Sequence, residues 1–253
     1  MDIEHISVSR KQTFDECPAK YNYRYHQKIV TLEPTQDYFT YGKIIHKVAE
    51  YYVKEQGKRD IALIANDVLS GGIFLEFNKP SPPLPDAYKN KFPQHLKNLK
   101  SLSDRIGYDG ELEYEFIHDL DPPNNCLVKG VIDRLIIRNG KYFILDYKTT
   151  KKGFFRKNSN TIRKDLQLRS YARVLQKLFN VKAEDIRAAL YYVEGPDLVP
   201  TKFTEESLET AEQELIGSYK TIKEMLPDDA HGKVGDQCRR CEFRKTCVFY
   251  SLT

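Results

Sequence analysis

Residues 130–148 read GVIDRLIIRNGKYFILDYK, and this stretch decides the fold. It contains two apolar runs rich in Val, Ile and Leu, separated by Asn139-Gly140. This dipeptide is typical of a two-residue hairpin turn, because both of its residues adopt positive φ readily. The stretch therefore predicts an antiparallel hairpin with strands over residues 127–138 and 141–148.

Polar residues interrupt this apolar hairpin at one end. Side chains two apart in a strand share a face, so Asp146 and Lys148 should point the same way. Asp133 lies on the other strand and could face Asp146 across the ladder. Two converging carboxylates repel each other unless something neutralises them, and Mg²⁺ does so with oxygen ligands. With a lysine beside the metal, these groups fit phosphodiester hydrolysis. The alternative is an ordinary Asp–Lys ion pair on an exposed sheet face.

The rest of the chain supplies elements around the hairpin. Leu112, Tyr114 and Phe116 alternate with glutamates, which predicts a strand with one wet face. Periodic patterns predict helices at 9–28, 42–55, 60–69, 163–179 and 205–226, and a further strand at 186–194. This order predicts one α/β domain over residues 1–253, with a mixed central sheet flanked by helices and a helical insertion at 56–105.

Two helices carry polar pairs spaced four residues apart. His46 and Glu50 would share a helix face, where His46 could offer an imidazole to a metal such as Mn²⁺. Gln167 and Tyr171 would share another, where Gln167 could hydrogen-bond the lysine or a phosphate and Tyr171 could contact nucleic acid. Each pair could equally be ordinary helix surface.

No acidic residue occurs between Tyr147 and Lys164. Phe154 and Phe155 lie within this segment, where aromatic rings could stack on bases. Basic side chains could engage the phosphate backbone. The candidate DNA-binding residues are Lys151, Lys152, Arg156, Lys157, Arg163 and Lys164. A solvated basic loop is the alternative, but the position directly after Lys148 favours DNA contact.

Four cysteines form a second candidate metal site. Cys238, Cys241 and Cys247 are clustered near one end of the sequence, and Cys17 lies near the other. A set of four cysteines can hold zinc or a [4Fe–4S] cluster, and spacing alone does not decide between them. Either would tie distant segments together and couple to folding. Cys126 lies in an apolar run and is expected to be a buried thiol.

Composition sets broad limits on the kind of protein. Of the 253 residues, 40% are hydrophobic and 30% charged, which is ordinary for a folded protein. The formal charge of +4 is too small to identify a nucleic-acid binder. No apolar run approaches the roughly 18–20 residues of a membrane span. With no secretory signal recognised, we expect a cytoplasmic protein without a membrane partner, whose cysteines are reduced or bind metal.

Together these motifs resemble the PD-(D/E)XK nuclease superfamily, specifically its RecB-like, Cas4-like iron–sulfur branch, as in the nuclease domains of AddB and Dna2. The resemblance extends from Cys17 to Cys247 and rests on all the motifs occurring in order. The matching positions are His46, Gly130 and Asp133, Asp146 and Lys148, Gln167 and Tyr171, and the four cysteines. One departure is Ile132, which stands where the superfamily pattern has proline.

The resemblance implies a restriction-endonuclease-like core and a structural [4Fe–4S] cluster held by the four cysteines. It also implies Mg²⁺ or Mn²⁺ bound by His46, Asp133, Asp146 and the main-chain carbonyl of Tyr147. Activity on DNA ends, often single-stranded, is the expected chemistry, with Lys148 orienting water.

The leading hypothesis is therefore a metal-dependent DNA exonuclease that prefers single strands and acts in recombination, repair or CRISPR-type processing. One alternative is a DNA-end-binding subunit that works with recombination, helicase or CRISPR-adaptation proteins. Another is a zinc-stapled nucleic-acid-binding module.

Overall fold

The predicted hairpin is present in the structure, a computed structural model that describes residues 1, 3–31, 37–75, 82–151, 153 and 156–250. Strands β2 (Leu127–Arg138) and β3 (Lys141–Lys148) pair antiparallel, with Arg138 opposite Lys141. Asn139 and Gly140 have φ of 49° and 70°. Both angles lie in the left-handed region that a tight two-residue hairpin turn requires.

The hairpin is the centre of a five-stranded mixed sheet in the order β1-β2-β3-β4-β5. β1 (Glu111–Asp119) and β4 (Ile186–Tyr192) confirm two predicted strands, and only the β3–β4 pairing is parallel. The edge strand β5 (Asp197–Lys202) was not predicted. Its central Pro200 argues against a strand in sequence, but an edge strand tolerates a missing backbone donor.

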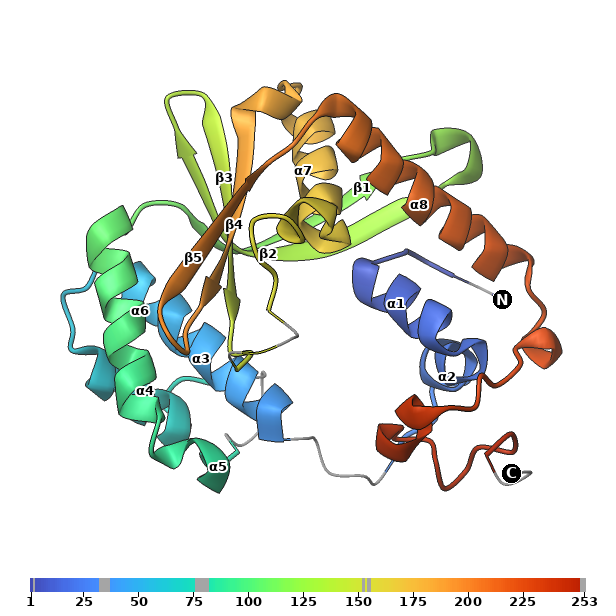
Figure 1. Ribbon diagram of the computed structural model, residues 1–253, viewed down its shortest axis with the longest axis horizontal. Helices are drawn as coiled ribbons and strands as arrows, with labels where there is room; N and C mark the ends of the chain where they lie inside the picture. The colour runs from blue at the N-terminus through green and yellow to red at the C-terminus, as the bar shows by residue number, and fades with distance from the viewer. Residues whose placement is uncertain (2, 32–36, 76–81, 152, 154–155, 251–253) are drawn as a thin grey trace.

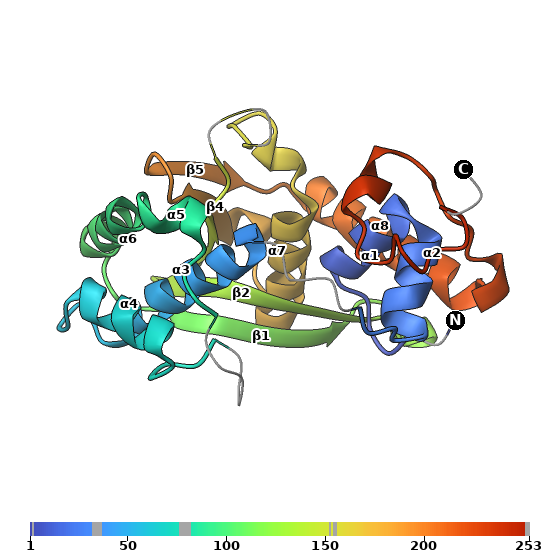
Figure 2. The ribbon, with the colours of Figure 1, turned by 90° about the horizontal axis from the view of Figure 1, so that it is seen from below.

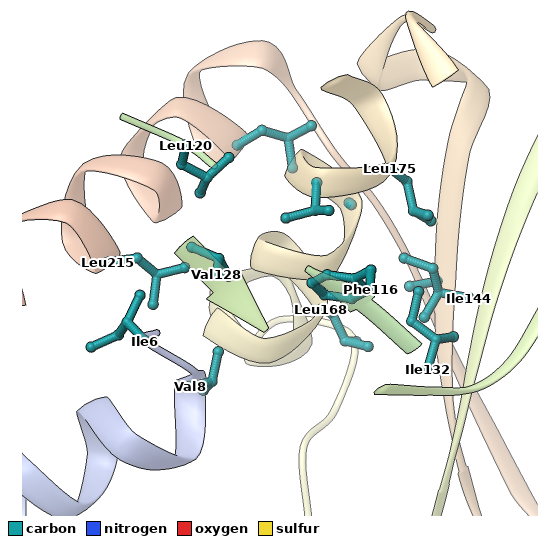
Figure 3. Close-up of a cluster of buried hydrophobic side chains, with 14 of the residues drawn as sticks. Ile6, Val8, Phe116, Leu120, Val128, Ile132, Ile144, Leu168, Leu175 and Leu215 are labelled. Carbon is teal, nitrogen blue, oxygen red and sulfur yellow. The ribbon is translucent and has the colours of Figure 1, made fainter. Parts of the chain in front are cut away.

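Three helices cover one face of the sheet: α1 (Val8–Glu16), α7 (Leu166–Phe179) and α8 (Glu205–Glu224). Figure 3 shows this core, in which Ile132 and Ile144 of the sheet meet Leu168 of α7. Thr204 caps α8 by accepting from the backbone N–H of Ser207 at 3.2 Å, which confirms the predicted helix start.

The other face is covered by α3 (Asp37–Lys54), α4 (Ile61–Ser70) and α6 (Phe92–Ile106), with the short α5 (Asp86–Lys89) beside them. Leu145 and Tyr147 of β3 are buried among these helices. The described helices of the 56–105 segment lie against the sheet (Figure 1) and share a core with it.

The predicted helix at 9–28 is interrupted at Cys17. α1 ends at Glu16, Cys17 is extended, and α2 (Pro18–Tyr21) then leads into a π-helical turn, Asn22–His26. Pro18 explains the break, because the residue before a proline is driven out of the helical region.

The carboxy-terminal segment packs against this break, as Figure 2 shows. The backbone N–H of Ala19 donates to the carbonyl of His231 at 3.2 Å, and the Asn22 amide donates to Pro227 at 3.0 Å. Short 3₁₀ turns complete the chain at Pro122–Asn124, Ile162–Lys164, Ala183–Asp185, Pro227–Asp229 and Asp236–Arg240. Within the described ranges, no helix combines the length and apolar character that a bilayer crossing demands.

Candidate active site

The hairpin ladder stops where its acidic residues begin. Its last pair is Arg134 opposite Leu145, and the next residue, Asp133, reaches β3 through its side chain. Asp133 Oδ2 accepts the backbone N–H of Tyr147 at 2.7 Å. Asp133 and Asp146 thus lie at the same end of the sheet, but not as the simple cross-strand pair that alternation predicts.

The reason is a slip in the alternation of β2. Ile132 and Leu135 both belong to the core beneath α7, although residues three apart in a regular strand point to opposite faces. The slip falls at Asp133 and Arg134. It frees Asp133 from a ladder position and turns its carboxylate towards α3.

His46 meets this carboxylate from α3. Its Nε2–H donates to the carbonyl of Tyr147 at 2.8 Å, and its Nδ1 lies 3.4 Å from Asp133 Oδ1. Burial disfavours the imidazolium, but attraction and hydrogen bonding to Asp133 outweigh it and raise the pKa of His46 to about 9. The same contact lowers the pKa of Asp133 despite its burial. The surroundings therefore favour a cation between Asp133 and the Tyr147 carbonyl.

Glu113 is the site residue that sequence reasoning missed. Ligand atoms of His46, Glu113 and Asp133 all lie within 4.8 Å of one another, and burial together with repulsion from Asp133 raises the pKa of Glu113. Glu113 has φ of 47°, a strained value for a side chain of this kind in a strand. The β1–β2 register steps over it, from Leu112 to Tyr114. The alternating glutamates suggested only a wet strand face, and this backbone irregularity leaves no mark in the residue pattern.

Asp146 and Lys148 share one face of β3, as predicted, and interact directly. Lys148 Nζ lies 2.7 Å from Asp146 Oδ2, while Gln167 Nε2 donates to Asp146 Oδ1 at 3.1 Å. Lys148 Nζ also donates to Gln167 Oε1 at 3.5 Å. Gln167 on α7 therefore positions both groups, and its Nε2 also donates to the hydroxyl of Tyr171 at 3.0 Å. The Tyr171 ring packs inside the protein against Phe116, which favours support of Gln167 over contact with DNA.

The pKa values of Asp133 and Asp146 are shifted in opposite directions. Burial and repulsion from Asp133 raise the pKa of Asp146 to about 6, against the smaller effect of Lys148. Burial lowers the pKa of Lys148, but Asp146 outweighs it and the pKa rises, so the ammonium stays charged. The raised pKa values of Asp146 and His46 show that this cluster favours added positive charge, and a divalent cation would supply that charge in place of the protons. The residues therefore fit a divalent cation.

The basic segment divides into two groups. Arg156 is engaged internally, because it donates to the carbonyls of Thr150 and Glu194 and covers the ring of Tyr192. Lys157 pairs with Asp165 at 2.5 Å. The side chains of Lys151, Arg163 and Lys164 are exposed, and Lys152, Phe154 and Phe155 lie outside the described residues. The contacts of Arg156 hold the segment against β4, and the Lys157 ion pair joins it to the start of α7, which leaves three of its described basic side chains facing solvent.

An exposed aromatic pair precedes the site on α3. Tyr38 and Phe39 are 49% and 56% exposed, and their ring centroids are 4.2 Å apart. Phe39 is seven residues before His46, so it shares the helix face of His46 about 10 Å away. Between them, a Cβ added at Gly42 would lie 3.8 Å from Oγ1 of Thr149, which follows Lys148 by one residue.

The four candidate cluster residues Cys17, Cys238, Cys241 and Cys247 line one small cavity. Tyr23 and Phe243 join them there, with ring centroids 5.5 Å apart. In the described part of the chain, no three of these sulfur atoms lie within 4.8 Å of one another. Cys126 is fully buried away from them, as predicted.

The family profile of the PD-(D/E)XK nuclease superfamily matches residues 5–248, nearly the whole chain. The chain belongs to this superfamily. Its five-stranded mixed sheet between two helical layers is consistent with the PD-(D/E)XK fold, and membership supports a nuclease.

Twenty-six chains of solved structures match this PD-(D/E)XK protein. A candidate exonuclease from Eubacterium rectale is 14% identical with a TM-score of 0.56, and the alignment covers 94% of this chain and 88% of that one. The protein SSO0001 is 16% identical with a TM-score of 0.39, covering 92% and 95%. No curated protein matches the sequence. At these identities the first likeness bears on the fold alone.

Proposed function

We propose that this PD-(D/E)XK protein is a divalent-metal-dependent DNA exonuclease. The observation that carries the proposal is the convergence of His46, Glu113 and Asp133 within 4.8 Å, next to the Asp146–Lys148 pair. Oxygen ligands with one imidazole suit Mn²⁺, and Mg²⁺ if the carboxylates dominate. We assign Asp146 and the Tyr147 carbonyl to the same ligand set.

Each residue has a separate task in this proposal. A bound divalent cation supplies Lewis-acid polarisation of the scissile phosphate. Lys148, whose raised pKa keeps it protonated, donates hydrogen bonds that orient water and offset developing negative charge. Gln167 fixes the Asp146 carboxylate and the Lys148 ammonium relative to each other, and Tyr171 supports Gln167 from the core.

Action on single-stranded ends is the finer part of the proposal. The similar Eubacterium rectale protein is described as a candidate exonuclease. Tyr38 and Phe39 offer exposed rings on which unpaired bases could stack, a contact that a duplex does not make readily. Lys151, Arg163 and Lys164 would hold the phosphate backbone of the incoming strand.

We further propose that Cys17, Cys238, Cys241 and Cys247 hold a structural [4Fe–4S] cluster. Zinc with Zn–S bonds of about 2.3 Å needs its sulfur ligands about 3.8 Å apart. The wider spacing of these sulfur atoms around a shared cavity suits the larger iron–sulfur cube better. The cluster would join the turn after α1 to the carboxy-terminal segment, which already contact each other.

The exonuclease proposal is tested with linear and circular single-stranded DNA in Mg²⁺ or Mn²⁺. We expect nucleotides to be released from the linear form only, and both Asp146→Ala and Lys148→Ala to abolish release. Exposed Lys58→Ala is the matched control and should cleave normally. Cleavage of circles would replace the exonuclease by an endonuclease. A folded wild type that binds ends but cuts neither form would favour the DNA-end-binding subunit.

A further inference from the structure

A second cavity lies over the opposite end of β3 from Lys148. It is an open groove of about 1070 Å³, lined by residues from the end of α6 and from strands β2 to β5. Its floor includes the apolar side chains of Phe143, Leu145, Ala189 and Leu198. The groove extends along β3 as far as Leu145, beside Asp146, and it also includes Arg163, but Asp133, Asp146 and Lys148 do not line it.

The rim of the groove is basic. Arg138, Lys141, Arg163, Arg187 and Lys202 all line it, and no acidic residue does so among those described. Arg138 and Lys141 have ion-pair partners, Asp109 and Asp185.

Arg187 and Lys202 face each other directly. The antiparallel register of β4 and β5 places these residues opposite each other, and like charges in that position destabilise a sheet. Both are exposed, and within the described residues neither makes an ion pair. A fold that keeps two adjacent, unneutralised cations beside an apolar groove has a place for an anionic ligand.

We propose that this groove binds an acidic peptide segment of a partner protein, with apolar side chains among its carboxylates. The carboxylates would neutralise Arg187 and Lys202, and the apolar side chains would cover Leu145, Ala189 and Leu198. Charge complementarity of this kind steers association and sets specificity. A nucleic-acid strand fits less well, because Leu145, Ala189 and Leu198 are aliphatic and, among the described lining residues, only Phe143 and Phe203 have rings on which bases could stack.

The test measures the fluorescence anisotropy of a labelled synthetic peptide of alternating aspartate and leucine. The wild-type protein should bind it saturably, and an all-aspartate peptide much more weakly. Arg187→Glu combined with Lys202→Glu should weaken binding by roughly tenfold or more, since both attractive charges become repulsive. The matched control combines Lys58→Glu with Lys97→Glu, which changes the net charge equally at exposed positions outside the groove and should bind as wild type.

A third variant separates binding from folding. Arg187→Glu alone creates an opposite-charge pair with Lys202, so its melting temperature should equal or exceed that of the wild type while peptide binding falls. All these variants should keep nuclease activity, so the peptide result and the nuclease result fail independently. Equal peptide binding by wild type and the double reversal would overturn the proposal. It would also be overturned if the double reversal weakened binding of a single-stranded oligonucleotide and not of the peptide, since the groove would then serve nucleic acid.

Discussion

Gly130 is the position where one added methyl group should disturb both stability and catalysis. A Cβ there would lie 2.4 Å from Cζ of Phe116 and 2.7 Å from Cε1 of Tyr171, whereas carbon atoms prefer about 3.5–4.0 Å. In Gly130→Ala both rings must therefore shift by about 1 Å. Overpacking of this kind costs about 1–3 kcal/mol. At about 2–4 °C per kcal/mol, the melting temperature should fall by about 2–12 °C.

The displacement should also reach the active site. Tyr171 accepts a hydrogen bond from Gln167, which in turn holds Asp146. A shift of about 1 Å in a positioning group can lower the rate up to about 100-fold. We would measure thermal melts together with single-turnover cleavage, so that loss of rate is compared in protein that remains folded.

Gly217→Ala is the matched control for this prediction. Gly217 is exposed in the middle of α8, and nothing lies within 4 Å of the position of an added Cβ. The same substitution should there stabilise the protein by about 1 kcal/mol through helix propensity and leave cleavage unchanged. Gly130→Ala protein with wild-type melting temperature and rate would refute the packing argument.

Three further predictions follow from the site and its surroundings. The pKa of His46 is raised to about 9 from an ordinary value of about 6.5, so the stabilisation from its charged form is complete below pH ~6.5 and is lost as pH rises towards ~9. Thermal melts of metal-free protein should show this pH dependence and His46→Asn should flatten it; an unchanged slope in His46→Asn would assign the effect to another group. Cys17→Ser should remove the visible absorption of the iron–sulfur cluster and lower the melting temperature, whereas Cys126→Ser should keep the absorption; a colourless wild type containing zinc would overturn that assignment. Replacing Tyr38 and Phe39 by alanine should raise KM for single-stranded DNA by about tenfold, since stacking contributes about 1–3 kcal/mol per base, while kcat stays near wild type; an unchanged KM would remove the pair from the substrate path.

Much of the core could be predicted because it depends on local patterns. Apolar alternation and Asn139-Gly140 specify the hairpin, and the two-residue period correctly puts Asp146 and Lys148 on one face. The spacing of Gln167 and Tyr171 likewise predicts their neighbouring positions on α7. These features need no knowledge of distant parts of the chain.

The features that sequence reasoning missed depend on tertiary context. The edge strand β5 was not predicted, because Pro200 argues against a strand in sequence. To predict the break after Cys17, the effect of Pro18 has to be weighed against helical periodicity. The left-handed backbone of Glu113 and the slip at Asp133 arise where the strands contact α3. Alternation alone therefore assigned Glu113 to the solvent-exposed face of its strand. The internal role of Arg156 depends on Tyr192 and Glu194, which come more than thirty residues later in the sequence.

The central claim is that DNA cleavage needs a divalent cation held at the acidic end of the hairpin. The most direct test compares wild type with Asp146→Asn on an end-labelled single-stranded oligonucleotide, with Mn²⁺ and with EDTA. Asn keeps the size of the side chain but loses the charge, and equal melting temperatures would verify folding. We predict that wild type cuts only with Mn²⁺ and that Asp146→Asn does not cut. Cleavage by Asp146→Asn at the wild-type rate, or by wild type in EDTA, would contradict this account.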